Sequence, residues 1–327
     1  MNSSTITICA TALLVLMGTA RSAESVDIVP EIFSPGVLSG PAHDSAPTFT
    51  PSGEVVYFGR SSPQQSTILV SERRTDGHWS EPRIAPFSGI WNDMEPAMSP
   101  DGRFLVFISD RPDREGGAKI EGFFNGSKQN GGRIWRVDSR EHSWSAPVLL
   151  PSSVNTGTSI FAPSVAADAS IYFMTTDTGS GKFRLFRAQF KDSGYLPAQP
   201  LSFSDGTTTD VDPAVSPDES FLVFGSGRIA GRGIDLFIAF RNGQAWSEPI
   251  HLGNDVNTPK SDAEPRLSPD GKTLYFSSER MVPIQFPRTR EQAESDMARM
   301  QSWDNGNYNI WQVPLSPLVV RAHRESK

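Results

Sequence analysis

Cysteine is almost missing from this sequence. The 327 residues contain one, Cys9, and it lies in an apolar N-terminal stretch. If that stretch is removed as a leader, no thiol and no disulfide remain. A chain of this length can bury a core without covalent cross-links. An exported protein without disulfides fits a periplasmic or secreted location.

The chain also has no excess of positive charge. The formal net charge is -7, and loss of Arg21 with the leader would make it one unit more negative. A negative balance argues against nucleic acid and anionic membrane surfaces as partners.

Apolar runs are short. The longest, ITICATALLVLMGTA from Ile6, has the length of a signal-peptide core and is too short to span a bilayer. The preceding MNSST has no Lys or Arg, which departs from the usual signal. We expect residues 1–23 to be a signal peptide and residues 24–327 to form one domain, monomeric and without a transmembrane segment.

Common catalytic signatures are missing as well. The sequence has no P-loop, no ordered Ser, His and Asp motif and no His-rich metal motif. Its five histidines are spread along the chain. We therefore expect no cofactor and no metal site, with Ca²⁺ held by clustered acids as the alternative.

A turn sequence is repeated instead. In EPRLSPDGKTLYFSSER, from Glu264 to Arg280, Pro269-Asp270-Gly271 separates two short runs rich in strand-forming residues. Proline presets φ, aspartate bonds its own backbone, and glycine accepts a positive φ. The stretch predicts a tight antiparallel hairpin.

Four further copies of this hairpin are present. The prolines that open the five copies are 49, 67, 50 and 52 residues apart, by subtraction: Pro47, Pro96, Pro163, Pro213 and Pro265. A period near fifty residues with only strands between the turns predicts a propeller.

Each copy is followed by segments that complete a blade. A third strand follows every hairpin, and a fourth segment such as AWSEPIHL, from Ala245, follows the first four. The fifth copy lacks its outer strand, and IFSPGVLSG, from Ile32, resembles one. We predict an all-β, five-bladed propeller of four-stranded blades whose N-terminal strand closes the last blade and leaves no free sheet edge there.

The repeats resemble the WD40-like repeats of TolB-type propellers, known as PD40. The matching motifs are the Ser-Pro-Asp turns at Ser99, Ser216 and Ser268 and the Ser-x-x-Arg endings, over nearly the whole chain after the leader. The resemblance implies the fold, with a six-bladed TolB-like ring as the alternative. It carries little information on activity. A TolB role in envelope integrity does not transfer, because five blades leave no room for TolB's additional N-terminal domain.

Acids recur where the innermost strands begin, and these strands line the central channel of a propeller. Glu95, Asp212 and Glu264 each stand directly before the blade proline. We expect all these carboxylates to meet at one mouth of the channel: Asp44, Asp93, Glu95, Asp210, Asp212, Asp262 and Glu264.

Arginines end the second strands at the same mouth: Arg60, Arg111, Arg228 and Arg280. Pairing of these arginines with Glu95, Asp212 and Glu264 would make the acids structural. Without such pairing, the acids, together with Arg111, Arg228 and Arg280, are candidate ligand-binding residues.

Two long insertions lie between the second and third strands. One, in blade two, contains Phe123 and Phe124, and one, in blade five, predicts a short helix that ends at Trp303. We expect both insertions to overhang the acidic mouth and these aromatic residues to contact a ligand.

Two functions compete. The first is a non-catalytic binding or scaffold protein that presents the channel mouth to an envelope protein, a peptide or a glycan. The second is a glycan-active hydrolase, implied by a resemblance of the segments at Asp212 and Glu264 to those of five-bladed propeller glycosidases. That resemblance makes Glu264 the general acid, with Asp212 and Glu95 as base and pKa modulator. A hydrolase requires at least one protonatable carboxyl that no arginine neutralises.

Overall fold

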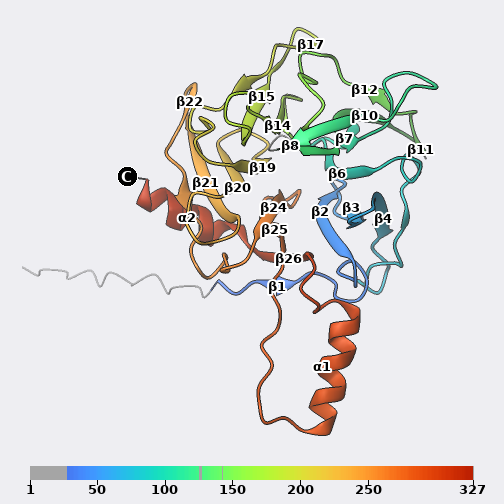
Figure 1. Cartoon of the computed structure of the whole chain (residues 1–327), viewed down its shortest axis with the longest axis vertical. Helices are drawn as coiled ribbons and strands as arrows, with labels where there is room; N and C mark the ends of the chain where they lie inside the picture. The colour runs from blue at the N-terminus through green and yellow to red at the C-terminus, as the bar shows by residue number, and fades with distance from the viewer. Residues whose placement is uncertain (1–27, 125–126, 142, 327) are drawn as a thin grey trace, which may run out of the picture.

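Each repeated turn joins the two inner strands of an antiparallel sheet, and five such sheets surround one axis as a five-bladed β-propeller (Figure 1). The structure is a computed structural model that describes residues 28–124, 127–141 and 143–326, with residues 123–124 and 127–129 described by their backbone alone. The prediction of five blades is confirmed, and the six-bladed alternative is wrong. The expected signal peptide lies outside the described residues.

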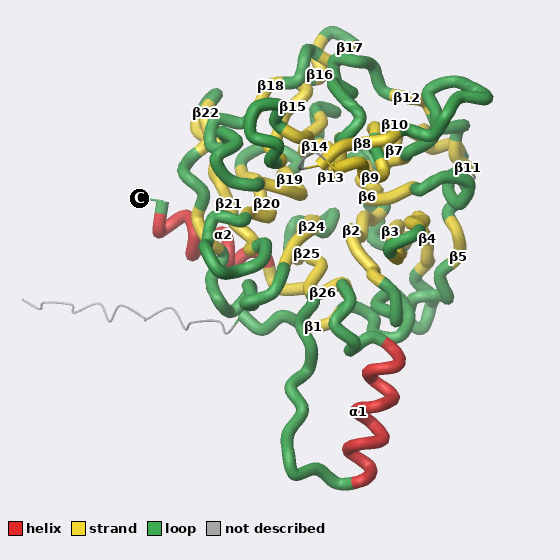
Figure 2. Tube along the Cα trace, viewed as in Figure 1, coloured by secondary structure: helices red, strands yellow, loops and turns green. Residues whose placement is uncertain are grey.

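The blades follow one another along the chain, and short strands alternate with loops throughout (Figure 2). Blade one contains β2 (His43–Phe49), β3 (Val55–Ser62), β4 (Gln65–Glu72) and β5 (Arg83–Ile84). Blade two contains β6 (Asp93–Met98), β7 (Phe104–Ser109), β10 (Arg133–Arg140), β11 (Ser143–Trp144) and β12 (Val148–Leu149). Blade three contains β13 (Ile160–Val165), β14 (Ile171–Thr176), β15 (Phe183–Ala188) and β18 (Gln199–Pro200), and carries the small hairpin β16 (Phe190–Lys191) and β17 (Gly194–Tyr195).

The last two blades contain the rest of the sheet structure. Blade four contains β19 (Asp210–Val215), β20 (Phe221–Ser226), β21 (Asp235–Asn242), β22 (Ala245–Trp246) and β23 (Ile250–His251). Blade five contains β24 (Asp262–Leu267), β25 (Thr273–Ser278), β26 (Asn309–Pro314) and β1 (Glu31–Ile32).

Strand β1 closes the ring. It pairs antiparallel with β26, with Glu31 opposite Gln312 and Ile32 opposite Trp311. This confirms that an N-terminal strand completes the last blade. Phe33, which follows β1, donates its backbone N–H to Ile310 and packs against aromatic rings of blades one and five. The seam is therefore held by both hydrogen bonds and apolar contact.

The repeated turns have the predicted chemistry. In blade two, the Asp101 carboxylate accepts hydrogen bonds from the Ser99 hydroxyl and from the backbone N–H of Arg103. Gly102 adopts a φ of 72°, a conformation that glycine reaches without steric penalty. The aspartates of the turns are thus structural residues at the end of the blades opposite the acidic mouth.

A bulge interrupts every inner strand. The residue before each blade proline has a φ between 49° and 55°, and the ladder to the second strand shifts register there: Ala46, Glu95, Ala162, Asp212 and Glu264. A bulge leaves its residue outside the hydrogen-bonded ladder and re-aims its side chain. Because of this repeated bulge, Glu95, Asp212 and Glu264 do not occupy regular hydrogen-bonded positions in their strands.

Tryptophans pack between adjacent blades. Trp144 of blade two donates its indole N–H to the Tyr57 hydroxyl of blade one at 3.1 Å. Trp246 of blade four meets Tyr172 of blade three edge to face. These contacts stabilise the ring by burying aromatic area with a satisfied polar edge.

The two insertions differ in position. Strands β8 (Glu121–Phe124) and β9 (Ser127–Asn130) form a hairpin between β7 and β10, and adjacent Gly132 bonds the backbone at Thr158 and Ile160, where blade three begins. Helix α1 (Arg290–Ser302) begins at a capping box on Thr289 and buries none of its residues. It projects away from the ring (Figure 1), so the expectation that it covers the mouth is wrong.

A second helix was not predicted. Helix α2 (Leu315–Glu325) follows β26 and buries Leu315, Leu318 and Ala322 in the cluster formed by blades four and five. No helix in the described ranges is both long and apolar enough to cross a membrane.

Candidate functional site: the central channel

Four arginine–aspartate pairs encircle the mouth of the channel. They join Arg60 to Asp44 at 2.6 Å, Arg111 to Asp93 at 2.6 Å, Arg228 to Asp210 at 2.9 Å and Arg280 to Asp262 at 3.0 Å. The aspartates are fully buried or nearly so. The arginines that end the second strands therefore pair with the acid that opens each inner strand. They do not pair with the acid at the bulge two residues later.

Each pair also anchors a loop. The Asp93 carboxylate accepts hydrogen bonds from the Ser88 hydroxyl and the backbone N–H of Gly89. Its partner Arg111 donates to the backbone carbonyl of Phe87. Asp44, Asp210 and Asp262 have similar environments, with their arginines bonded to Val37, Phe203 and Val256. Because each carboxylate is bonded by its arginine and each arginine also bonds a backbone carbonyl of the loop, we interpret these pairs as structural clamps.

The bulge acids have different partners. Glu95 Oε2 accepts a hydrogen bond from the backbone N–H of Ala162 at 2.6 Å, and Asp212 Oδ2 accepts one from the backbone N–H of Glu264 at 3.1 Å. Glu264 Oε2 is bonded by the Ser277 hydroxyl at 2.8 Å. Among the described residues, none of the three carboxylates forms a salt bridge. The arginines that the sequence suggested as partners of these three acids pair with the neighbouring aspartates instead.

Burial and mutual repulsion change the protonation of these acids. Glu95 is 9% exposed and Asp212 6% exposed, whereas Glu264 is half-buried. Burial, followed by the charges of Asp212 and Glu264, raises the pKa of Glu95 to about 8. Burial and the charge of Glu264 raise the pKa of Asp212 to about 7. Near neutral pH, this cluster therefore contains both protonated and ionised carboxyl groups.

Arg266 supplies positive charge to the same cluster. It lies two residues after Glu264 on β24 and is 5% exposed. Its charge lowers the pKa values of Glu95 and Asp212 but does not offset burial and repulsion. Arg266 was not among the site residues predicted from the sequence. A comparison of the copies would have singled it out, because the equivalent positions hold the small residues Thr48, Ala97, Ser164 and Ala214.

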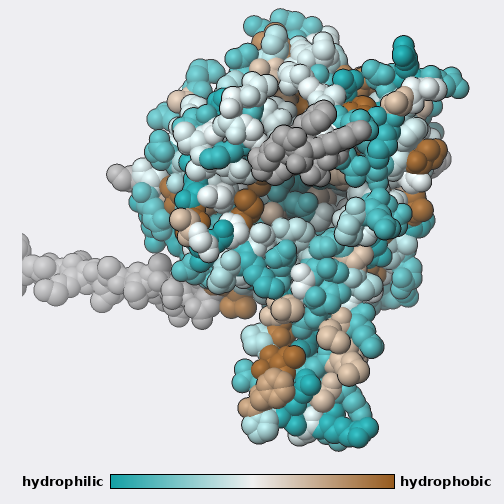
Figure 3. Space-filling view, viewed as in Figure 1, coloured by the Kyte–Doolittle hydropathy of each residue, from teal (hydrophilic) through white to brown (hydrophobic). Residues whose placement is uncertain are grey.

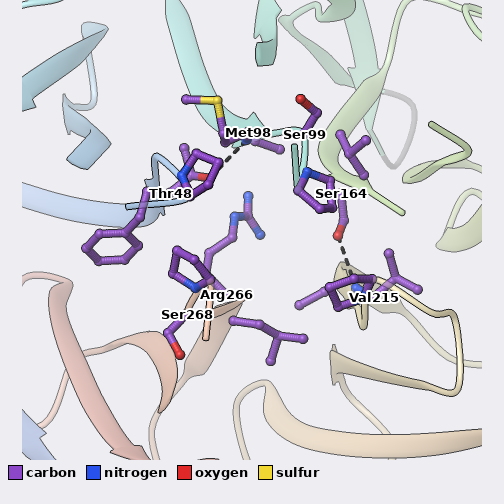
Figure 4. A pocket seen from close by; sticks show the side chains of 16 residues that line it. Thr48, Met98, Ser99, Ser164, Val215, Arg266 and Ser268 are labelled. Carbon is purple, nitrogen blue, oxygen red and sulfur yellow. Dashed lines mark hydrogen bonds between the residues drawn. The ribbon is translucent and has the colours of Figure 1, made fainter. Parts of the chain in front are cut away.

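The channel has a cavity at its other end, beside the repeated turns. Its volume is about 90 Å³, and all five blades contribute to its wall. Arg266 points into the middle of this cavity (Figure 4). In the view of Figure 3 the molecule is also hollowed near the centre of the ring. Arg266 thus stands between the acid cluster and the turn-side cavity.

The remaining predicted site residues do not join this cluster. Trp303 caps the C-terminal end of α1 and meets Trp311 edge to face. The side chains of Phe123 and Phe124 lie outside the described residues. In the described part of the chain, no three His, Cys, Asp or Glu side chains are grouped so that they could hold a metal ion.

This chain is similar to known proteins in structure, but no sequence family matches it. No family model and no curated protein matches the chain. TolB from Acinetobacter baumannii aligns with 84% of this chain at 14% identity and a TM-score of 0.44. This chain covers 54% of that structure, about half of its length.

Two further neighbours are also propellers of low identity. A protein assigned as TolB from Agrobacterium tumefaciens aligns with 84% of this chain and 91% of its own, at 15% identity and a TM-score of 0.48. A gluconolactonase from Xanthomonas campestris aligns with 90% of this chain and 98% of its own, at 15% identity and a TM-score of 0.49. At these TM-scores the likenesses assign this chain neither a family nor an activity, and PD40 membership stays a prediction.

Proposed function

We propose that this protein is a non-catalytic binding protein whose channel holds an uncharged, hydroxyl-rich ligand of the glycan class at Glu95, Asp212 and Glu264. The supporting observation is that these three carboxyl groups lie close enough for their charges to interact but form no salt bridge with a described residue, while every clamp aspartate forms one. Carboxyl groups left without ion pairs in a propeller channel are available to a ligand.

The charge state of the cluster favours an uncharged ligand. A protonated carboxyl donates one hydrogen bond and accepts others, and a carboxylate only accepts. Because the pKa values of Glu95 and Asp212 are raised to about 8 and about 7, both kinds of group are present near neutral pH. Sugar hydroxyls require both donors and acceptors. A multiply charged cation would instead need all three carboxyl groups ionised in a buried setting.

Isothermal titration with a panel of neutral oligosaccharides tests this proposal. The variants Glu95→Gln, Asp212→Asn and Glu264→Gln keep the shape of each side chain and remove its ability to ionise. We expect each to weaken binding at least tenfold. Asp270→Asn, an exposed turn carboxyl at the opposite end of the blades, is the matched control and should bind like the wild type. Unchanged affinity in all three channel variants would reject the proposal.

Glycoside hydrolysis is the second candidate, and one observation favours it. A general acid must be protonated at working pH and not neutralised by an ion pair. Glu95 meets both conditions, because its pKa is raised to about 8 and it forms no salt bridge with a described residue. This would assign the acid role to Glu95, whereas the resemblance to propeller glycosidases assigned it to Glu264.

Release of reducing ends from the same panel separates the two functions. A hydrolase should lose activity above about pH 8, as Glu95 ionises, and Glu95→Gln should reduce kcat by at least about a hundredfold. If the wild type binds oligosaccharides but releases no reducing ends, hydrolysis is rejected and only the binding function remains. Export of the protein, like its monomeric state, stays a prediction from the sequence.

A further inference from the structure

Arg266 has hydrogen-bonding capacity that the protein does not use. It is 5% exposed, and its Nη1 donates to the backbone carbonyl of Pro265 at 2.9 Å. Its Nε and Nη2 have no hydrogen-bond partner among the described residues. A buried guanidinium with unsatisfied donors is costly, because its desolvation is not offset. The missing partner therefore has to be explained.

The unused side of Arg266 is the side that other arginines of this chain present to carboxylates. Arg60 bonds Asp44 through Nε and Nη2, at 2.6 and 3.1 Å. Two further arginine–carboxylate pairs repeat this two-bond arrangement: Arg187 with Glu219 at 2.6 and 3.0 Å and Arg232 with Asp235 at 2.6 and 3.1 Å. Nε and Nη2 form the planar edge that matches the two oxygens of a carboxylate.

The turn-side cavity beside Arg266 contains donors and apolar walls but no acid. Thr48 Oγ1 accepts a hydrogen bond from the backbone N–H of Met98, and Ser164 Oγ accepts one from Val215, so both hydroxyl hydrogens can be directed elsewhere. Both residues lie around Arg266 in Figure 4. Apolar side chains complete the wall: Phe49, Val165, Val215 and Leu267.

We propose that the turn-side cavity is a binding site for a small aliphatic monocarboxylate, held side-on by Nε and Nη2 of Arg266. The single positive charge suits one negative charge, and the apolar walls suit a short hydrocarbon tail. The volume of about 90 Å³ limits the ligand to a few heavy atoms. The cavity is separate from the proposed glycan site, because Glu95, Asp212 and Glu264 do not line it, although the charge of Arg266 also acts on these acids.

Thermal unfolding of the full chain with added salts tests the site. Sodium acetate and sodium propionate are compared with sodium chloride and sodium phosphate at equal ionic strength. A carboxylate at about ten times its Kd should raise Tm by roughly 2–4 °C, since only the folded state binds it. Chloride and phosphate should shift Tm by less than half as much. Equal shifts with all four salts would overturn the proposal.

Variants localise the effect. Arg266→Met should abolish the response to acetate, and Arg266→Lys should weaken it at least tenfold and remove the preference for acetate over chloride, because an ammonium has no planar edge. Arg290→Met is the control, since Arg290 is on α1 with its side chain 88% exposed, and it should respond like the wild type. An undiminished response in Arg266→Met would also overturn the proposal.

A measurement on the unmodified protein covers the case in which Arg266→Met fails to fold. In a chain with ¹⁵N-labelled arginine, the Nε–H resonance of buried Arg266 should exchange slowly with solvent. Titration with acetate should shift this resonance with the same Kd as the change in Tm. A resonance that does not move at saturating acetate would reject side-on binding.

Discussion

The Glu95 carboxylate of blade two accepts a hydrogen bond from the backbone N–H of Ala162, the equivalent bulge residue of blade three, at 2.6 Å. Asp212 of blade four makes the same contact with Glu264 of blade five at 3.1 Å. One oxygen of each acid thus links neighbouring blades. The other oxygen of each acid accepts no hydrogen bond from a described residue, so it is free for a proton or for the proposed ligand.

Replacement of Glu95 by Gln should stabilise the protein at alkaline pH. Because burial and neighbouring charges raise the pKa of Glu95 from 4.5 to about 8, the folded state binds this proton more tightly than the unfolded state. The resulting stabilisation is present at low pH and is lost as pH rises from 4.5 through about 8. At pH 9, Glu95→Gln should therefore exceed the wild type in unfolding free energy by about 2–4 kcal/mol.

Urea unfolding from pH 5 to pH 9 measures this difference. The difference should shrink steadily toward pH 5, where the folded Glu95 side chain is uncharged, as the glutamine is. Glu294→Gln changes an exposed glutamate of α1 and should follow the wild type at every pH. A difference between Glu95→Gln and the wild type that does not depend on pH would contradict the raised pKa.

Removal of a clamp aspartate should have the opposite effect. Asp93→Ala would leave the largely buried Arg111 without its carboxylate and free the Ser88 hydroxyl and the Gly89 N–H. We expect a loss of about 3–5 kcal/mol in unfolding free energy at pH 7. Equilibrium urea unfolding gives the value, and a loss below about 1 kcal/mol would show that the clamps are not structural.

Glu219 should be more stabilising than the glycine that other turns have in its place. It adopts a φ of 58°, where the equivalent Gly102 and Gly271 have 72° and 67°. Its carboxylate bonds Arg187 at 2.6 and 3.0 Å, the Tyr172 hydroxyl at 2.8 Å, and Arg241. Glu219→Gly relieves the strained backbone but leaves two arginines unpaired, so we expect a net loss of about 2–3 kcal/mol at pH 7.

The pH dependence distinguishes this effect from a change in backbone strain. Burial alone would raise the pKa of Glu219, but the bonds from Arg187 and Tyr172 outweigh burial and lower it. A lowered folded-state pKa gives stability that is present above 4.5 and is lost as pH falls below that value. The difference between variant and wild type should thus shrink in acid, and a constant difference from pH 3 to pH 7 would assign it to the backbone.

Phe33→Ala should weaken the closure of the ring. The Phe33 ring is 9% exposed and contacts Phe49, Trp79 and Tyr275 across the seam. We expect a loss of about 3–5 kcal/mol in unfolding free energy. Hydrogen exchange should accelerate first in β1 and β26. Val29→Ala, at a position 65% exposed, is the control, and equal losses in both variants would argue against a structural role for the seam.

The sequence predicted the blades well because each rests on local chemistry. Proline, aspartate and glycine specify the same turn in several copies, and the missing outer strand of blade five could be assigned to residues near Ile32 by its likeness to the other outer strands. Helix α2 was not predicted, because it lies after the last repeat and outside the blade pattern; its Pro317 is in the first turn, where a helix tolerates proline.

The site was predicted less well because it depends on bulge geometry. The acids at the mouth were identified, but the sequence could not show that the arginines select Asp93, Asp210 and Asp262 over the acids two residues later. That choice follows from the positive φ at each bulge, which alters the alternation of side chains along the strand. The orientation of α1 depends on tertiary contacts that no local pattern encodes.

The pairing of β1 with β26 has a consequence for the order of synthesis. Glu31 and Gln312 are partners in one sheet although 281 residues separate them, by subtraction. On the ribosome, β1 emerges long before β26 exists, and it has to wait with its backbone groups solvated while four blades are completed. Closure is therefore a late folding event of high contact order, because β1 cannot pair before β26 has formed.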